Sequence, residues 1–176
     1  VVNGSELTAT DHIRFENYGD KANSVNGNTL YVANGATVTV PYCNLAWTNN
    51  QIVVSNATLT CTAKTDKEAL FLGGVVDPAI YPTNCALVVE GSTPKISVPN
   101  GGTSYLRYGS HLVFRIPKEG YAEGYVPMEL GSFSYYNDSF IDVEGLEAML
   151  QDLKDRGVTA RQKFTLITTM VAALPT

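Results

Sequence analysis

Short apolar runs along the chain alternate with tight polar turns, and the pattern recurs. Each copy has a short β run, a turn of Asn, Gly or Ser, and a Thr-rich alternation that returns to apolar residues. Val, Ile and Thr suit a pleated strand, and Asn or Gly tolerates the positive φ of a sharp corner. Each copy therefore predicts a strand, a corner and a second strand. The copies lie at residues 1–10, 30–41, 52–62 and 87–99.

The copies are separated by distances typical of the coils of a β-solenoid. The anchor valines Val2, Val32, Val54 and Val89 are 30, 22 and 35 residues apart, and solenoid coils tolerate insertions at their corners. An immunoglobulin-like sandwich more often shows turns every 8–12 residues or so without a repeated phrase. Unrelated hairpins that share common turn residues are the other alternative. The repeat favours a solenoid, and residues 111–117 read as one more coil. Further short apolar runs lie between the copies, at residues 13–15, 45–47, 69–72 and 105–108.

One helix is predicted, over residues 145–156. Gly157 ends the apolar pattern, and Lys154 and Arg156 lie in the last turn, where the helix dipole favours cations. The apolar positions follow helical spacing on one side. They are Leu146, Met149, Leu150 and Leu153.

The chain is predicted to consist of two parts, and the helix belongs to the second. Residues 1–130 are predicted to form β-solenoid coils, and residues 131–176 a β-α-β segment with strands at 139–143 and 163–168. Such a segment covers the open end of a solenoid, whose last coil otherwise exposes apolar side chains and unpaired backbone. Residue 1 is Val, and the sequence ends in an apolar run. We therefore expect a fragment of a longer polypeptide, with the C-terminal segment continuing beyond it.

Composition narrows the functional classes. Only 16% of the residues are charged and 44% are hydrophobic, which argues against a disordered chain. Twelve Lys and Arg against 17 Asp and Glu give a net charge of −5, which argues against a nucleic-acid partner bound through a basic face. No apolar run approaches the ~20 residues that a membrane-spanning helix needs.

The three cysteines do not indicate a cofactor, a metal site or a disulfide framework. Cys43, Cys61 and Cys85 are far apart and lack the C-x-x-C pairing of zinc or redox sites. At most one pair can form a bridge. We expect small, buried side chains in a β core.

No catalytic constellation is evident. His12 and His111 stand alone, with no nucleophile motif near them and no phosphate-binding loop in the chain. The stretch at 17–28 offers oxygen side chains but lacks the acids of a calcium loop, and it reads as a turn. Carboxylate pairs merit attention because β-helix glycosidases use them, although polar turns explain them equally. The pairs are Asp66 with Glu68, Asp138 with Asp142, and Glu119 with Glu123.

A cluster of aromatic and basic residues is the candidate binding site. On alternating strand positions Tyr105 and Arg107 share one face, and an aromatic and cationic surface can stack sugars or peptide groups. Tyr108, His111 and Arg115 follow closely. The plainer reading makes Tyr105 half core and Arg107 its solvent cover. The group Tyr135-Tyr136-Asn137, which precedes Asp138, is also suited to line a sugar site, and a polar turn before a strand explains it equally.

The repeats at residues 30–40 and 52–60 resemble those of bacterial right-handed parallel β-helix surface proteins, such as autotransporter passenger domains. The resemblance covers about the first two-thirds of the chain. It implies a mainly β fold: a right-handed parallel β-helix (solenoid), here with a small C-terminal α/β cap containing one helix. It also implies an exported protein, extracellular or on the cell surface, that contacts a carbohydrate or another surface ligand.

We therefore expect a non-enzymatic module for adhesion, glycan contact or a stalk. Two alternatives remain open at this point. One is a fragment of a polysaccharide lyase or glycosidase, and the other is a structural segment of a fibre or tailspike-like assembly.

Overall fold

The computed structural model describes residues 1–15, 26–46, 48–73, 84–107, 109–122, 124–130, 132–136 and 139–157. Within these ranges the protein is mainly β, with sixteen strands in three parallel sheets and one helix. This arrangement is consistent with a parallel β-helix or solenoid.

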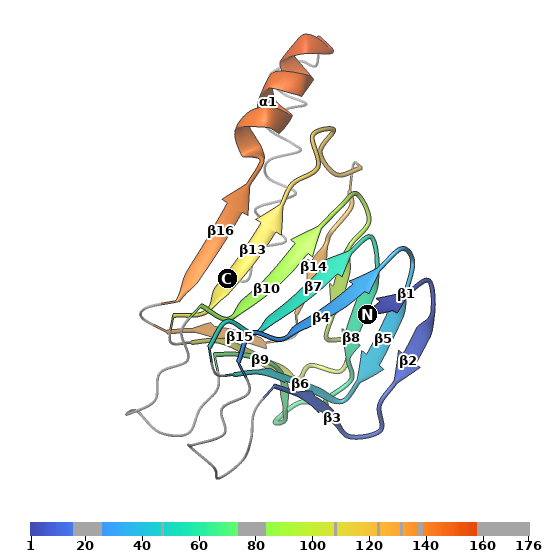
Figure 1. Ribbon diagram of the computed structural model, residues 1–176, viewed down its shortest axis with the longest axis vertical. Helices are drawn as coiled ribbons and strands as arrows, with labels where there is room; N and C mark the ends of the chain where they lie inside the picture. The colour runs from blue at the N-terminus through green and yellow to red at the C-terminus, as the bar shows by residue number, and fades with distance from the viewer. Residues whose placement is uncertain are drawn as a thin grey trace.

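Sheet A contains six strands, and every neighbouring pair is parallel. Figure 1 shows its later strands side by side along one face of the molecule. In sheet order the strands are β1 (Val2–Asn3), β4 (Thr29–Ala33), β7 (Gln51–Ser55), β10 (Ala86–Glu90), β13 (His111–Arg115) and β16 (Phe140–Glu144).

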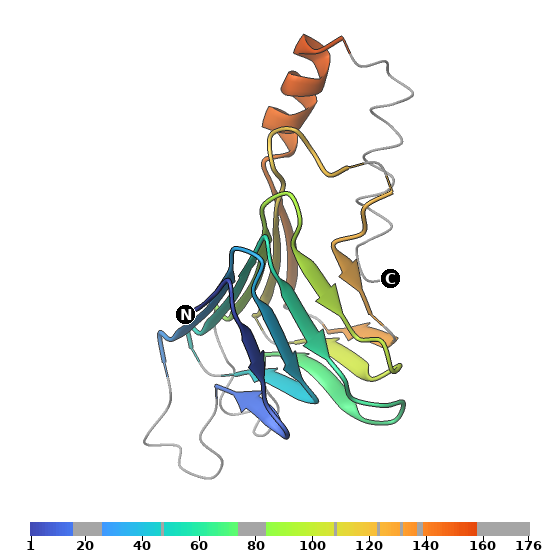
Figure 2. The same ribbon diagram turned by 90° about the vertical axis from the view of Figure 1, so that its right-hand side faces the viewer.

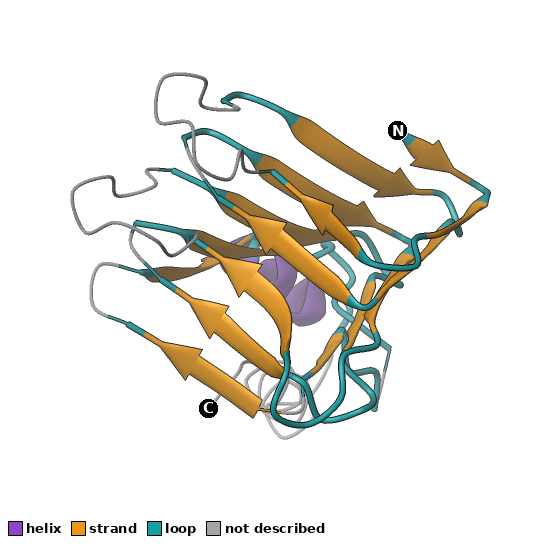
Figure 3. Ribbon diagram, turned by 90° about the horizontal axis from the view of Figure 1, so that it is seen from below, coloured by secondary structure: helices purple, strands orange, loops and turns teal. Residues whose placement is uncertain are grey.

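Sheets B and C contain five parallel strands each. Figure 3, seen from below, shows the strands stacked in layers. Sheet B contains β2 (Glu6–Thr8), β5 (Thr37–Val40), β8 (Thr58–Cys61), β11 (Lys95–Ser97) and β14 (Met128–Glu129). Sheet C contains β3 (His12–Arg14), β6 (Tyr42–Leu45), β9 (Glu68–Leu72), β12 (Thr103–Leu106) and β15 (Ser132–Tyr135).

The chain passes through sheets A, B and C in turn and then returns to A, and we call one such passage a coil. The register confirms the repeat seen in the sequence. Val2 lies opposite Val32, Val32 opposite Val54, and Val54 opposite Val89. The next coil places Phe114 opposite Val89, as expected for one more coil after residue 110. Each spacing between anchor residues is therefore the length of one coil.

The inward-facing residues of the three sheets form one apolar core. In β5 and β8 the side chains alternate between buried and half-buried, as the period of two predicts. Residues one coil apart meet in the interior: Val38 lies opposite Leu59, and Leu59 opposite Ile96, all fully buried. Burying side chains of this size is worth about 1.5–3 kcal/mol each. The core therefore runs along the stack of coils.

Asparagines occupy the corners between sheets. Asn34 and Asn56, at the corner from A to B, adopt φ of 54° and 48°. The side-chain amide of Asn34 donates a hydrogen bond to Oδ1 of Asn3 at 2.7 Å. At the corner from C to A, the side-chain amide of Asn84 donates a hydrogen bond to Oδ1 of Asn49 at 2.9 Å. Asn tolerates the left-handed conformation, and its amide can bond to the coil above or below. The positive φ expected at these corners is confirmed.

The expected helix is present as α1 (Leu146–Asp155), bounded by Gly145 and Arg156. Its buried residues, Met149 and Leu153, pack against Ile116 in the segment that follows β13. Figures 1 and 2 show α1 projecting beyond the ends of the strands. The helix thus packs on an extended corner of the last complete coil.

The sheets continue past the boundary expected at residue 130. β15 pairs with β12, and β16 pairs with β13 along its full length. β15 and β16 therefore extend sheets C and A, because the edges of β12 and β13 present backbone groups that a further parallel strand can pair with. In β16 Ile141 and Val143 remain 38% and 40% exposed. The strand expected at 163–168 lies outside the described residues.

Candidate binding face on sheet C

The outer face of sheet C carries an aromatic pair at neighbouring strands. In β9 the core-facing Leu70 and Leu72 alternate with Phe71, and in β12 Leu106 belongs to the core while Tyr105 does not. Phe71 and Tyr105 are register partners, with ring centroids 5.2 Å apart. Alternation along each strand and register between coils thus place two rings together on the side of sheet C away from the main core, where Phe71 is buried and Tyr105 is half-buried.

Arg107 joins these rings to a third. Its guanidinium carbon lies over the Tyr136 ring at 4.2 Å, over the Tyr105 ring at 4.4 Å and over the Phe71 ring at 5.0 Å from the ring centres. Guanidinium groups at such distances are attracted by the ring quadrupole. We call Phe71, Tyr105, Arg107 and Tyr136 the Arg107 cluster.

The backbone ladder of sheet C extends beyond its strands to position this cluster. The Arg107 amide donates to Leu72 at 2.9 Å, and the Tyr136 amide donates to Leu106 at 3.0 Å. Gly73, with φ of 93°, lies against the same turn, and a Cβ there would come within 2.0 Å of the Arg107 carbonyl oxygen. Only glycine permits this approach, so Gly73 fixes the path of the chain beside Arg107.

The Arg107 guanidinium is incompletely satisfied by the protein. Its Nη2 donates to the Tyr136 hydroxyl at 2.8 Å. Its Nε is buried and has no hydrogen-bond partner among the described residues. Within the part of the chain that the structure describes, no carboxylate lies at ion-pair distance from Arg107. An arginine held by rings, with no carboxylate partner in this part of the chain, is of the kind that pairs with an anionic ligand.

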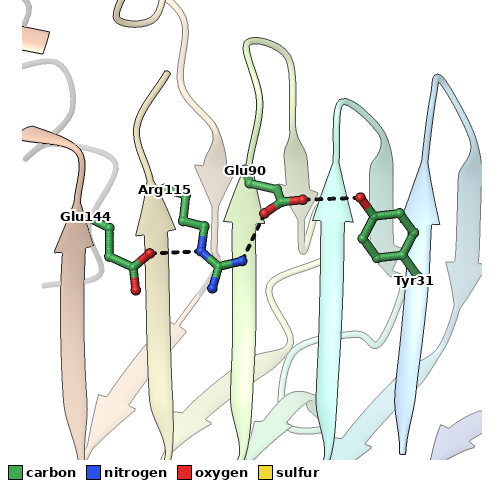
Figure 4. Close-up of polar contacts among 4 residues, drawn as sticks. All are labelled: Tyr31, Glu90, Arg115 and Glu144. Carbon is green, nitrogen blue, oxygen red and sulfur yellow. Dashed lines mark hydrogen bonds and ion pairs between the residues drawn. The ribbon is translucent and has the colours of Figure 1, made fainter. Parts of the chain in front are cut away.

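Arg115, on the outer face of sheet A, is bonded quite differently. Its Nε donates to Glu144 at 2.8 Å and its Nη1 to Glu90 at 3.1 Å, while the Tyr31 hydroxyl donates to Glu90 at 3.3 Å (Figure 4). The four residues come from β4, β10, β13 and β16. The hydrogen bond to Glu144, followed by the one to Glu90, raises the pKa of the Arg115 guanidinium above its ordinary value. We call this set the Arg115 ladder.

The two sheets also differ in their charged residues. The strands of sheet A contain three acids, Glu90, Asp142 and Glu144. The strands of sheet C contain one, Glu68, which begins β9 at the end remote from Gly73. The Arg107 cluster therefore lies on the face with fewer strand carboxylates.

The structure brings some of the predicted site residues together and separates others. Tyr105 and Arg107 share one face, as their spacing predicts. Tyr108 lies outside the described residues. His111 and Arg115 belong to β13 in sheet A, because the chain turns at Gly109, with φ of 65°, between the two sheets. His111 thus lies on a different face of the molecule from Arg107, although it follows Arg107 by four positions in the sequence.

His111 forms a group of its own on sheet A. Its Nδ1 lies 2.6 Å from a carboxylate oxygen of Asp142, and its ring stacks on Phe140 with centroids 4.8 Å apart. Both partners are on β16. A histidine paired with a carboxylate and stacked on a ring links the last two strands of the sheet.

The sequence did not single out Phe71 as a site residue, and it placed Tyr136 only within a separate group, Tyr135-Tyr136-Asn137. Phe71 lies in an apolar run, where alternation alone marks it as outward-facing. Tyr136 lies 29 residues after Arg107. Alignment of β12 with β15 by coil length would have placed Tyr136 beside Arg107, since Leu106 and Tyr135 are register partners.

The remaining chemical candidates stay apart from this cluster. The three cysteines are buried, as expected, and none of them forms a disulfide bond. Burial raises the pKa of the Cys61 thiol to about 12 and that of Cys85 to about 11, so these thiols are protonated near neutral pH. Asp138, Glu123 and most of residues 17–28 lie outside the described residues. In the described ranges no three His, Cys, Asp or Glu residues gather as a metal site would require.

Comparison with known proteins identifies no relative. No family model matches the chain, and no match was found among curated proteins or among solved structures. Among the described residues, no helix has the length and apolar character needed to cross a membrane.

Proposed function

We propose that the chain is a right-handed parallel β-helix segment of an exported, non-enzymatic surface protein that contacts a glycan through sheet C. Support for the fold comes from the three parallel sheets and from the match between sequence repeats and coil register. Support for export comes from the resemblance of the repeats to those of bacterial surface β-helices.

The Arg107 cluster carries the proposal for glycan contact. Aromatic rings offer apolar faces to the C–H groups of a pyranose, while the guanidinium and tyrosine hydroxyls offer hydrogen bonds to its oxygens. Tyr136 is 40% exposed, and Tyr105 is half-buried, so both rings reach the surface. Phe71 and Tyr105 lie in β9 and β12, and the backbone amides of Arg107 and Tyr136 bond to the neighbouring strands, which limits the entropy lost on binding.

A glycan array tests the proposed contact. The parent chain is compared with a double variant, Tyr105→Ala with Arg107→Gln, on the same array. We expect the double variant to lose the parent's signals. Arg115→Gln is the matched control, because it removes the same charge from an outer face but leaves the Arg107 cluster intact. Unchanged binding by the double variant would refute the assignment.

Two further measurements test export and the absence of catalysis. An antibody against the chain is expected to label intact cells of the source organism and to lose its target after external protease treatment. Labelling only after cell lysis would contradict export. Incubation of the chain with the glycans that it binds is expected to release no new reducing ends or unsaturated products. Release above a blank containing heat-denatured protein would indicate an enzyme instead.

A further inference from the structure

We infer that the Arg107 cluster selects an acidic saccharide, in which a carboxylate or a sulfate ester pairs with the Arg107 guanidinium. This inference rests on the proposed function and names its ligand class. It starts from the contrast between two arginines on outer faces. Arg115 meets two carboxylates of the protein, whereas Arg107 meets none in the described ranges.

The surroundings of Arg107 strengthen its pairing with an anion. The rings of Phe71, Tyr105 and Tyr136 displace water from the guanidinium, and an ion pair is stronger where water is excluded. The hydrogen bond from Nη2 to the Tyr136 hydroxyl fixes the orientation of the group. A guanidinium held in place loses little entropy when it binds a planar carboxylate.

The guanidinium retains donors for such a ligand. Within the described residues Nη2 is the only one of its three nitrogens that makes a hydrogen bond. Nη1 keeps both of its N–H groups and Nη2 keeps one, and two parallel N–H bonds of the planar guanidinium match the two oxygens of a carboxylate or sulfate. An acidic saccharide would supply these oxygens, together with a pyranose ring to lie beside Tyr136.

A neutral sugar fits the same cluster less well. The guanidinium lies over both tyrosine rings, so one face of each ring is already covered. A neutral pyranose would stack on what remains and would leave the arginine charge without a counterion. The ligand that completes the cluster is therefore one that carries its own negative charge.

Charge distribution favours this face over the outer face of sheet A for an anion. The chain as a whole carries −5, which repels acidic ligands. The strands of sheet A contain Glu90, Asp142 and Glu144, whereas those of sheet C contain only Glu68. We therefore expect an acidic glycan to approach sheet C, with an affinity that falls as salt screens the guanidinium.

Calorimetric titration of the 176-residue chain tests the inference with three probes of matched length. The probes are oligogalacturonate, sulfated dextran oligosaccharide and unmodified dextran oligosaccharide. We expect either anionic probe, or both, to bind more tightly than dextran, and the two anionic arms show whether carboxylate or sulfate is preferred. Raising sodium chloride from about 50 to 300 mM should weaken the anionic binding.

Matched variants assign the binding to one side chain. Arg107→Gln is expected to weaken anionic binding about tenfold or more, because two charge-assisted hydrogen bonds are lost. Arg107→Lys, which keeps the charge but lacks the planar fork, is expected to weaken it less. Arg115→Gln should leave it unchanged. Circular dichroism establishes that each variant is folded, and Arg107→Lys serves as the test if Arg107→Gln fails to fold.

The outcomes separate this inference from the proposed function. Equal binding of dextran and the anionic probes, or full anionic binding by Arg107→Gln, overturns the inference and leaves glycan contact standing. Binding to no glycan, on the array or in solution, overturns both. Anionic binding that falls equally in Arg107→Gln and Arg115→Gln overturns the inference as well, because it would show attraction to overall charge.

Discussion

The outer faces of sheets A and C each carry an arginine at the end of a strand, and the protein uses the two in opposite ways. Arg115 spans Glu90 and Glu144 and ties β10, β13 and β16 together. Arg107 stacks on three rings and has no carboxylate partner in the described residues. The comparison teaches that the partners of an arginine, more than its exposure, distinguish a residue that links strands from a residue that can bind a ligand.

The largest effect is expected where the chain passes closest to itself. In Gly73→Ala the new Cβ would lie 2.0 Å from the Arg107 carbonyl oxygen, at a φ of 93°. We expect the free energy of unfolding to fall by about 3 kcal/mol or more, with loss of the Arg107 cluster. Urea unfolding measures the change. Gly35→Ala, where φ is 77° and the space is open, is the control and should cost about 1 kcal/mol. Equal losses would contradict the role of Gly73.

An alkaline pH titration tests the buried core that lies beneath both outer faces. Burial raises the pKa of the Cys61 thiol from 9.0 to about 12. The unfolded thiol ionises first, so its contribution to stability is complete below pH 9 and is lost as the pH rises toward 12. Between these limits the free energy of unfolding should fall by about 1.4 kcal/mol per pH unit for this thiol.

The matched variant for this titration is Cys61→Ala. It should show a shallower fall between pH 9 and 11 in chemical unfolding experiments, although it starts from a lower stability because a buried sulfur is missing. The variant isolates this thiol, because every other group that titrates in this range is the same in both proteins. A variant with the same slope as the parent would show that Cys61 is not the source.

The two arginines should differ in their effect on stability. Arg115→Gln leaves Glu90 and Glu144 without their cation, and we expect a loss of about 1 kcal/mol, modest because the Arg115 side chain is 49% exposed. Within the described residues, Arg107→Gln removes ring contacts and one hydrogen bond, and it also removes a buried Nε that has no partner there. We expect it to cost less than Arg115→Gln in thermal unfolding at low salt. The reverse order would break the comparison.

The smallest effects are expected from single hydroxyls at the two faces. Tyr31→Phe removes a 3.3 Å bond to Glu90, and Tyr136→Phe removes a 2.8 Å bond from Arg107. Each should lower the free energy of unfolding by about 0.5 kcal/mol. Only Tyr136→Phe should also weaken the binding of an acidic glycan, which titration calorimetry would detect. An equal effect of Tyr31→Phe on binding would remove the distinction between the faces.

The coil register was predictable from the sequence because it depends on side chains that repeat. Val2, Val32, Val54 and Val89 mark the same position in successive coils, and apolar burial requires them to stack. The helix was predictable for a similar reason, since one apolar stripe and a following glycine define it. Periodicity within a segment is enough for both features.

The composition of the site was harder to predict because it depends on offsets between segments. In sheet C the register shifts between Thr103 and Ser104, so that Glu68 faces the first and Leu70 the second. This irregularity brings Phe71 opposite Tyr105, and alternation along either strand alone does not reveal it. The turn at Gly109 likewise sends His111 to sheet A, although four residues of sequence suggest a shared face.

The corner from sheet C to sheet A has a consequence for how such a protein can diversify. The connections there range from the four residues between β12 and β13 to the fourteen between β3 and β4, whereas the strands on either side keep their register. Length can therefore change at this corner without altering the stack. Arg107 and Gly73 lie next to this corner. Insertions there would therefore change the surroundings of Arg107, while Phe71 and Tyr105 on the strands would keep their positions. Proteins that share this arrangement of sheets would acquire new ligand specificities through changes in the length of the connection from sheet C to sheet A.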